Sequence, residues 1–165
     1  MSWQSYVDQL TTKVTAHGTM EHCVEKAGIV SLADGSIWAN TPDFGLYGYS
    51  VDVPTEDGAS TEPCEINEVD LIRHVANNNG TSNSKAGIRI ANERYYAVSH
   101  DDKEGTVYLK KNGGGGCLAK CNQCVVFASW NGAVQTAGFH PQPQNPGLCN
   151  ELVEKVAQYL KSTGY

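Results

Sequence analysis

The sequence predicts an α+β domain in which the N-terminal and C-terminal helices pack together on one face of a central antiparallel β-sheet. Three observations predict this fold: an amphipathic helical stripe at each end of the chain, short apolar segments between them, and tight-turn residues separating those segments. The 165 residues, of which 40% are hydrophobic, suffice for one hydrophobic core. We therefore expect a single domain over residues 1–165.

Apolar residues at helical spacing predict the two terminal helices. The first stripe follows Ser2, a favourable N-cap residue, and predicts a helix that ends near Gly18. Its apolar positions are Trp3, Tyr6, Val7, Leu10 and Val14. The second stripe follows Pro146 and Gly147 and predicts a helix that stops at Gly164. Its apolar positions are Leu148, Leu152, Val153, Val156, Tyr159 and Leu160.

Short apolar segments between the two helices predict the strands. The Asp34-Gly35 turn joins the first two into a hairpin. The expected strands are residues 27–31, 36–39, 86–90, 95–99, 106–109, 117–120 and 125–130. Residues 67–76 have the apolar spacing of a short internal helix. Residues 45–65 and 77–84 show no clear period, so we expect two surface loops, the first an acidic loop insertion.

The charge distribution limits the classes of partner. A formal net charge of -6 argues against general nucleic-acid binding, which needs a basic footprint. Nine of the 18 acidic residues lie in residues 27–72, which hold no Lys or Arg, whereas residues 73–120 hold eight of the 12 basic residues. One face that is locally positive would suit an acidic protein or an anionic lipid. A scatter of solvated charges is the alternative.

The six cysteines are expected to be free thiols. The sequence has no signal peptide and no apolar run long enough for a transmembrane segment, so we expect a cytoplasmic protein in a reducing compartment. Cys117, Cys121 and Cys124 fall on expected strands, where residues three apart point to opposite faces, so no metal site is expected. No cofactor is expected either. A thiol-dependent hydrolase built on Cys149 and His140 remains a minor hypothesis without a supporting motif.

Two patterns admit a structural and a functional interpretation. The four glycines of residues 113–116 lack the Gly-Lys-Ser/Thr of a phosphate loop, which favours a flexible turn. Aromatic residues gather at both ends of the chain, where they can cap the core or form an exposed shelf. Rigid aromatic shelves bind polyproline II peptides at low entropic cost. The sequence therefore leaves a proline-rich peptide site as a hypothesis.

Six segments resemble the profilin family in order and spacing, over nearly the whole chain. The opening MSWQSYVD and the DGSIWA of residues 34–39 are similar to the family's first helix and tryptophan strand. The remaining segments are Lys110-Lys111 before the glycine-rich turn, QCVVF at 123–127, PGLCN at 146–150, and Tyr159-Leu160 with Gly164-Tyr165. The resemblance implies the profilin-like fold, with no enzymatic activity.

The resemblance also implies two binding surfaces. The poly-proline-binding positions are Trp3, Tyr6, Trp38, Tyr159, Leu160 and Tyr165. The actin-binding positions are Arg94, Tyr96, Lys110, Lys111, Asn150 and Lys155, and the phosphoinositide-binding positions are Arg94, Lys110 and Lys111. The implied function is binding of monomeric actin, nucleotide exchange on actin, and delivery to proline-rich proteins such as formins in the cytoplasm and cytoskeleton. A phosphoinositide-binding module with weak actin affinity is the alternative.

The sequence departs from the family pattern at three places. Ala91-Asn92 replaces a Gly-Gly turn, and Asn tolerates a positive φ. Residues 45–65 are longer and more acidic than expected for the family, and Tyr108 replaces a residue that is commonly basic.

Overall fold

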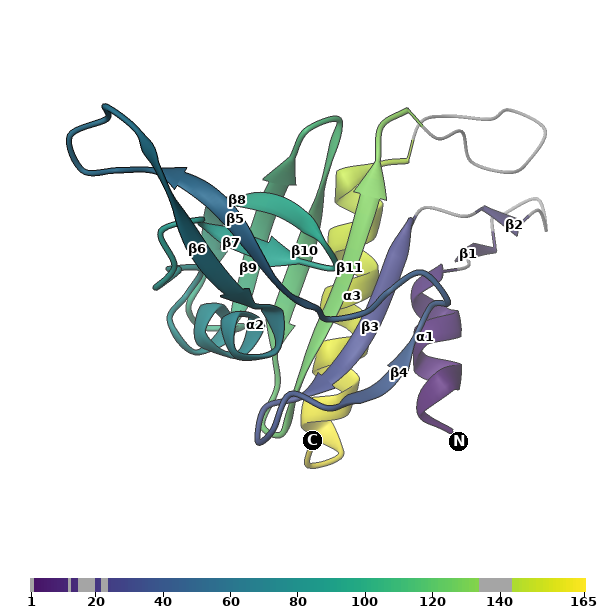
Figure 1. Ribbon diagram of the computed structural model, residues 1–165. Coiled ribbons are helices and arrows are strands. Elements are labelled where there is room, and N and C mark those ends of the chain that lie inside the picture. The colour runs from purple at the N-terminus through teal and green to yellow at the C-terminus, as the bar shows by residue number, and fades with distance from the viewer. Residues whose placement is uncertain (1, 12, 15–19, 22–23, 134–143) are drawn as a thin grey trace.

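A curled antiparallel sheet with seven strands forms the centre of the computed structural model (Figure 1). The structure describes residues 2–11, 13–14, 20–21, 24–133 and 144–165. The strand order is β4-β3-β11-β10-β9-β8-β7, and each neighbouring pair is antiparallel. The strands are β3 (Lys26–Ser31), β4 (Ile37–Asn40), β7 (Ile88–Ile90), β8 (Glu93–Asp101), β9 (Thr106–Lys111), β10 (Gly114–Lys120) and β11 (Cys124–Asn131). Each strand expected within these bounds is confirmed, with small shifts at the ends.

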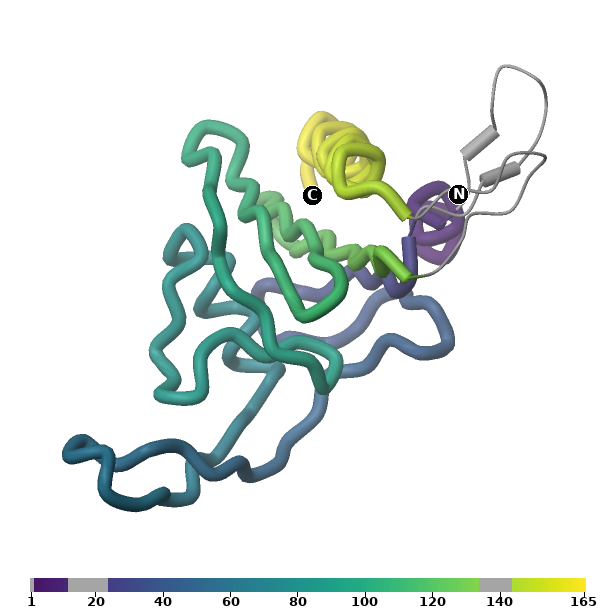
Figure 2. Tube along the Cα trace, turned by 90° about the horizontal axis from the view of Figure 1, so that it is seen from above, coloured from purple at the N-terminus to yellow at the C-terminus, as the bar shows by residue number. Residues whose placement is uncertain are grey.

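Both terminal helices lie on one face of this sheet, as the sequence predicts. Helix α1 (Trp3–Thr11) packs on β3 and β4, helix α3 (Pro146–Ser162) packs on β10 and β11, and the two helices contact each other (Figure 2). Helix α2 (Glu68–Asn77) confirms the expected internal helix and contacts β7 and β10. None of the helices in the described residues is long and apolar enough to span a membrane.

Alternation along the strands divides the core into two layers. On β11, Val126 and Ala128 belong to the apolar cluster that includes Val7, Val153 and Leu160 of α1 and α3. Their neighbours Val125 and Phe127 belong to the cluster that includes Leu71, Ile72 and Val75 of α2. Because successive side chains point to opposite faces of a strand, the unbroken apolar run of β11 from position 124 to position 128 serves both layers. The sheet is therefore buried on both sides at its centre.

The first helix is shorter than the sequence predicts. It ends at Thr11, and Lys13–Val14 form strand β1, which pairs with β2 (Met20–Glu21). The expected end near Gly18 is therefore wrong, since Val14 is in a strand. The β-branched residues around Thr11 favour extended backbone over helix, which explains the early end. The apolar residue at position 14 continued the helical stripe by coincidence.

The last helix begins and ends with local signals. The side chain of Asn145 accepts a hydrogen bond from the backbone N–H of Leu148 and caps the N-terminus. This cap satisfies one of the helix's unpaired donors. At the other end, Gly164 has φ 97°, which a glycine adopts without steric cost, and it follows the helix as the sequence predicts.

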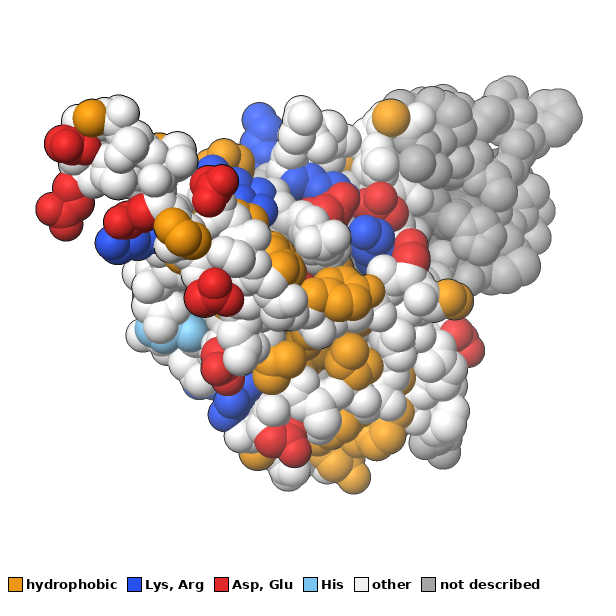
Figure 3. All heavy atoms as spheres, viewed as in Figure 1, with side chains coloured by type: hydrophobic (Ala, Val, Ile, Leu, Met, Phe, Trp, Pro, Cys, Tyr) orange, Lys and Arg blue, Asp and Glu red, His pale blue; other side chains and the backbone are white. Residues whose placement is uncertain are grey.

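Residues 45–65 are not a loop throughout. They contain β5 (Gly48–Pro54) and most of β6 (Thr61–Asn67), which pair as an antiparallel hairpin. The hairpin projects from the side of the sheet opposite α3 (Figures 1 and 2), and acidic side chains lie at its outer end (Figure 3). Prolines and acids obscured its β-propensity. The alternation of Tyr49, Val51 and Val53 was the signal for a strand, and these three side chains are the less exposed ones of β5.

The structure accounts for two unusual segments of the sequence. Gly114 to Gly116 are buried in β10 and do not form a flexible turn. A side chain would not fit at Gly115, where a Cβ would lie 2.8 Å from the Trp130 ring nitrogen. Ala91 and Asn92, between β7 and β8, have φ values of 52° and 65°. The expected turn thus reaches positive φ values with an alanine and an asparagine in place of glycines.

Candidate functional site

Five of the six residues expected to bind poly-proline form one aromatic cluster from three separate segments. The Trp3 ring of α1 has its centroid 4.6 Å from the Trp38 ring of β4 and 4.9 Å from the Tyr165 ring. Tyr6 lies 5.6 Å from Trp3 and 5.9 Å from Tyr159. These separations are typical of interacting aromatic pairs. The rings therefore form a continuous row from Trp38 to Tyr159.

Exposure distinguishes the members of this row. Tyr159 and Tyr165 are 51% and 39% exposed, whereas Trp3, Tyr6 and Trp38 are partly buried against the core. The phenol of Tyr6 hydrogen bonds to that of Tyr159, and partial burial together with this neighbour raises the pKa of Tyr6. Aromatic faces and phenol groups are thus both available on one surface.

Leu160 does not belong to that surface. Its side chain is completely buried among α1, α3 and the sheet. The helical period accounts for the difference, because residues adjacent on a helix point about 100° apart, so Tyr159 faces outward while Leu160 faces the core. We therefore assign Leu160 to the core.

Hydrogen bonds hold the strand that carries Trp38. The amide of Gln4 in α1 donates to the backbone oxygen of Asn40 at 3.2 Å, which ties the helix to β4. In the preceding turn, the Asp34 carboxylate accepts hydrogen bonds from the backbone and the hydroxyl of Ser36, and these bonds lower the pKa of Asp34. Arg73 of α2 donates to the backbone oxygens of two turn residues at 2.9 and 2.6 Å. These hydrogen bonds together hold the β3–β4 hairpin, which carries Trp38, in one position.

A second surface contains three of the residues expected to bind actin. Tyr96 pairs with Lys110 across β8 and β9, and Arg94 lies two residues before Tyr96, so the three side chains share one face of the sheet. All three are exposed, and the Arg94 guanidinium lies 4.9 Å from the centroid of the Tyr96 ring. This surface combines two positive charges with an exposed aromatic ring.

A hollow of about 210 Å³ adjoins this surface between β8, β9, β10, β11 and α3. Lys110 and Asn150, both expected actin-binding residues, line it. Lys155, another expected actin-binding residue, is exposed further along α3. The sequence did not indicate the remaining wall of the hollow, which includes Val98, Tyr108 and Trp130. Val98, which is 65% exposed, adds an apolar side chain to this wall.

Tyr108 explains one departure from the family pattern. Its hydroxyl donates a hydrogen bond to the Glu154 carboxylate of α3. This bond, followed by burial, raises the pKa of Tyr108. Tyr108 is therefore a link between the sheet and α3 and adds no positive charge to this surface.

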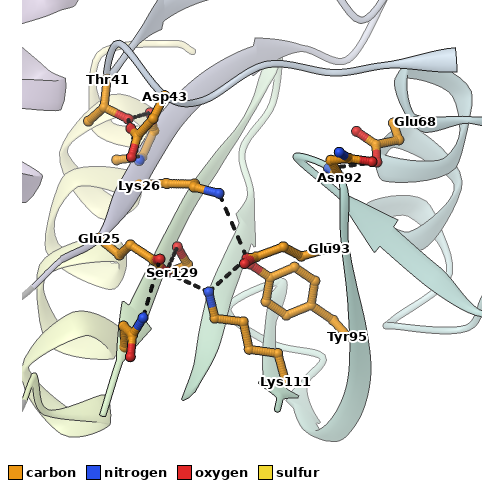
Figure 4. Close-up of polar contacts among 12 residues, drawn as sticks. Glu25, Lys26, Thr41, Asp43, Glu68, Asn92, Glu93, Tyr95, Lys111 and Ser129 are labelled. Atoms are coloured by element: carbon orange, nitrogen blue, oxygen red, sulfur yellow. Dashed lines mark hydrogen bonds and ion pairs between the residues drawn. The ribbon is translucent and has the colours of Figure 1, made fainter. Parts of the chain in front are cut away.

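Lys111 follows Lys110 on β9, so it lies on the opposite face of the sheet, and it is only 6% exposed. Its ammonium group lies 2.5 Å from the Glu25 carboxylate and 2.7 Å from that of Glu93 (Figure 4). Burial alone would raise the pKa of Glu25, but the hydrogen bond and charge of Lys111 hold it below its ordinary value. Lys111 therefore does not fit the expected contact with actin or phosphoinositides. The alternation of a β-strand separates the two lysines.

The cysteines are free thiols where the structure describes them. Cys117, Cys121, Cys124 and Cys149 are buried, and Cys64 is partly exposed. Cys121 lies in the turn before β11 and not on a strand, and its side chain and that of Cys124 belong to the same apolar cluster, beneath α1 and α3. The expectation that these two thiols point to opposite faces is therefore wrong. In the described part of the chain, no group of three or more His, Cys, Asp or Glu is placed to hold a metal, and His140 lies outside that part.

Comparisons with known proteins agree with this architecture. The sequence model of the profilin family matches residues 1–165. The chain is 34% identical to the profilin of Tetrahymena pyriformis over 166 residues, which cover 99% of this chain and 98% of the relative. It is 30% identical to profilin-3 of Dictyostelium discoideum over the full length of both proteins. Profilin IA of Acanthamoeba castellanii superposes with a TM-score of 0.62 at 23% identity, over 99% of this chain and 100% of that one. This chain belongs to the profilin family.

Proposed function

We propose that this protein binds proline-rich peptides through the aromatic cluster of Trp3, Tyr6, Trp38, Tyr159 and Tyr165. The observation that carries the proposal is the continuous row of rings drawn from α1, β4 and the end of the chain. A polyproline II helix has no internal hydrogen bonds and presents free carbonyls, so flat rings pack against its prolines while indole and phenol groups donate to its backbone.

A structure of a family member supports the class of partner. Mouse profilin IIa, which superposes with a TM-score of 0.56 at 18% identity, was solved in complex with a double repeat from the FH1 domain of mDia1. By analogy, formins and other proline-rich proteins are the proposed partners of this chain.

A matched pair of tyrosine substitutions tests the peptide site. Tyr159→Ala should weaken binding of a polyproline peptide about tenfold, because the variant loses one exposed aromatic anchor and keeps the core. Tyr96→Ala is the control, since Tyr96 is 55% exposed and lies on the other surface. Peptide titration followed by tryptophan emission measures both affinities. Equal affinities for the two variants would contradict the assignment.

Trp38→Ala tests the centre of the cluster. Because its ring packs on Trp3, we expect a loss of at least about 2 kcal/mol of peptide-binding free energy, as for an interface hot spot. Circular dichroism of the variant establishes that it is folded before the comparison. Unchanged affinity in a folded variant would remove the groove assignment.

We further propose that the protein binds monomeric actin through Arg94, Tyr96, Lys110, Asn150 and Lys155. The support is the positive, partly aromatic surface beside the hollow, together with membership of the family. Nucleotide exchange on actin would follow if the protein binds an open actin conformation more tightly than a closed one. This chain would perform no chemistry itself and is proposed to be a non-enzymatic regulator.

Lys110→Glu tests the actin surface. The substitution should weaken actin binding at least about tenfold, because it reverses a charge at an exposed interface position, and it should leave polyproline binding unchanged. Release of a fluorescent nucleotide from actin, with and without the protein, tests exchange directly. Equal loss of both binding activities would indicate misfolding, and unchanged actin affinity would contradict the surface.

Phosphoinositide binding is the alternative function, and the exposed pair of Arg94 and Lys110 is what favours it. With Lys111 buried, only two of the three expected cations reach this surface. Sedimentation with vesicles containing phosphoinositides, compared with vesicles of equal charge made from phosphatidylserine, separates headgroup recognition from simple charge attraction.

The remaining proposals concern the chain as a whole. Residues 1–165 are proposed to fold as one domain, since both apolar clusters share the same sheet. The hairpin within residues 45–65 is proposed to be an acidic insertion. The protein is proposed to act in the cytoplasm and cytoskeleton, where its proposed partners are found.

A further inference from the structure

The aromatic cluster is completed by a residue outside regular structure. Tyr165 follows the end of α3, and its ring meets Trp3 edge-on at 4.9 Å and Trp38 at 6.4 Å. Its backbone N–H donates to Leu160, which continues the helix-ending hydrogen bonds. These bonds fix the nitrogen side of Tyr165 only. A second set of contacts must hold its carbonyl side, because an exposed segment after a helix otherwise samples many conformations.

Gln123 supplies this second set. It lies in the three-residue turn between β10 and β11, residues 121–123, which is far from Tyr165 in sequence. Its backbone N–H donates to the oxygen of Tyr165, and its side-chain amide donates to the oxygen of Gly164 at 2.9 Å. One exposed glutamine thus binds the last two residues of the described chain by two hydrogen bonds.

We propose that Gln123 is a positioning residue for the peptide site, which sets the place of Tyr165 in the aromatic row without touching the peptide. The proposal rests on the proposed function of the cluster. Tyr165 contributes the ring that borders both tryptophans, so a shift of its backbone moves one wall of the site. Preorganised aromatic anchors bind at lower entropic cost than anchors that must be ordered during binding.

An isosteric pair of substitutions tests the inference. Gln123→Glu keeps the shape but replaces the donating amide with an acceptor, which faces the oxygen of Gly164. We expect polyproline affinity to fall about threefold to tenfold, as for loss of one side-chain hydrogen bond. Asn122→Asp is the control, because Asn122 is exposed in the same turn and undergoes the same change of charge.

A double-mutant cycle separates positioning from a general structural effect. In the Tyr165→Ala background, Gln123→Glu should change polyproline affinity by less than about twofold, because the ring that it positions is gone. An equal fall in both backgrounds, or no fall in either, would overturn the inference. If the wild-type protein does not bind polyproline, the proposed function fails instead, so the two failures are distinguishable.

A separate observation in this turn concerns its thiols. Cys121 lies in this turn and Cys124 begins β11, and the backbone N–H of Cys121 donates to the oxygen of Cys124 at 2.8 Å. This bond extends the β10–β11 ladder one step beyond its last opposed pair, Lys120 and Val125. Opposed residues of an antiparallel ladder have Cα atoms about 4.5–5.5 Å apart, which lies in the range that a disulfide spans. Both side chains belong to the same apolar cluster, and the Cys121 thiol also donates to the backbone oxygen of Ala157 at 3.7 Å.

The surroundings distinguish the two thiols from each other and from Cys117. The hydrogen bond from Cys124 and the nearby Lys161 ammonium lower the pKa of Cys121, against the effect of burial. The hydrogen bond to Cys121 and burial raise the pKa of Cys124. Burial raises the pKa of Cys117 well above its ordinary value. Of these three thiols, Cys121 is therefore the one most easily converted to the nucleophilic thiolate, and Cys124 is the neighbouring thiol that keeps its proton.

We infer that Cys121 and Cys124 form a modification site that a peroxide oxidises to a disulfide. The Cys121 thiolate attacks one peroxide oxygen, the O–O bond breaks, water leaves after protonation, and a sulfenic acid forms on Cys121. The Cys124 sulfur then attacks the Cys121 sulfur, and its proton leaves with the sulfenic oxygen as a second water. Two thiols lose two electrons in total, and hydrogen peroxide gains them.

Mass spectrometry of the protein treated with hydrogen peroxide tests this site. Peptide mapping should locate a link between Cys121 and Cys124 that a dithiol reductant removes. Cys124→Ser should instead leave a sulfenic acid on Cys121, which dimedone traps, whereas Cys117→Ser should leave the link intact. A link to another cysteine, or unreacted thiols at both positions in the folded protein, would overturn the inference.

Discussion

Lys111→Met removes an ammonium group that lies within 2.7 Å of two carboxylates on the α2 side of the sheet. Loss of one partner from a buried ion pair costs about 3–5 kcal/mol, because the remaining charge stays desolvated. Glu25 and Glu93 retain 21% and 33% of their side-chain exposure and can regain some hydration. We therefore expect the free energy of unfolding to fall by about 2–3 kcal/mol.

The pH dependence follows from the same contact. Because Lys111 outweighs burial and lowers the pKa of Glu25, the folded state binds this proton less tightly than the unfolded state. The resulting stabilisation is present above the unfolded value of about 4.3 and is lost as the pH falls through the folded pKa. The stability difference between wild type and Lys111→Met should therefore narrow below about pH 4.

Urea denaturation at about pH 7 and about pH 3.5 measures both effects. Lys110→Met is the matched control: its side chain is exposed, so its unfolding free energy should stay within about 0.5 kcal/mol of wild type while actin affinity falls. Folded Lys111→Met should keep its actin affinity. Equal stability losses for the two variants, or a difference that does not change with pH, would refute this account of the adjacent lysines.

Three further predictions concern the framework around the site. Glu68 is buried and accepts hydrogen bonds from Tyr47, Tyr49 and Asn92. Glu68→Gln should therefore lower the unfolding free energy, measured by urea denaturation, by about 3 kcal/mol. A loss below about 0.5 kcal/mol would contradict a stabilising role for the Glu68 carboxylate. Burial, followed by the hydrogen bond to Glu68, raises the pKa of Tyr49 to about 12. Because the folded state keeps this proton to a higher pH than the unfolded state, the free energy of unfolding should fall as the pH rises from about 10 to about 12. The absorbance of tyrosinate measures the shift of the pKa. Asn92 has φ 65°, so Asn92→Ala should lower the free energy of unfolding by about 1 kcal/mol, whereas Asn92→Gly should not lower it. Equal melting temperatures for the two variants would contradict backbone strain at this position.

Local sequence patterns predicted the elements that depend on local signals. The Asp34-Gly35 turn, the stripe of the last helix and its end at Gly164 follow from short-range backbone preferences, and the structure has all three. The aromatic residues at the chain ends were also identified from the sequence, because their type and helical spacing are visible there. The family resemblance added Trp38, which is distant in sequence from both ends.

Only the tertiary structure determined which face of a strand or helix points to a binding surface and which points to the core. Lys110 and Lys111 look equivalent in the sequence, but strand alternation places one at a surface hollow and the other between Glu25 and Glu93. Leu160 was likewise expected in the peptide site beside Tyr159, but its side chain lies in the core. The carboxylates that hold Lys111 come from distant segments, so only the paired sheet brings them together.

The sequence by itself determined the fold class, the terminal helices and the aromatic composition of one surface. Only the folded chain determined the end of α1 at Thr11, the β5–β6 hairpin and the hydrogen bonds from Gln123 to Gly164 and Tyr165. The physical reason is common to these cases: local propensity and periodicity act over a few neighbouring residues, whereas strand pairing, burial and contacts between distant segments are fixed by packing of the whole chain.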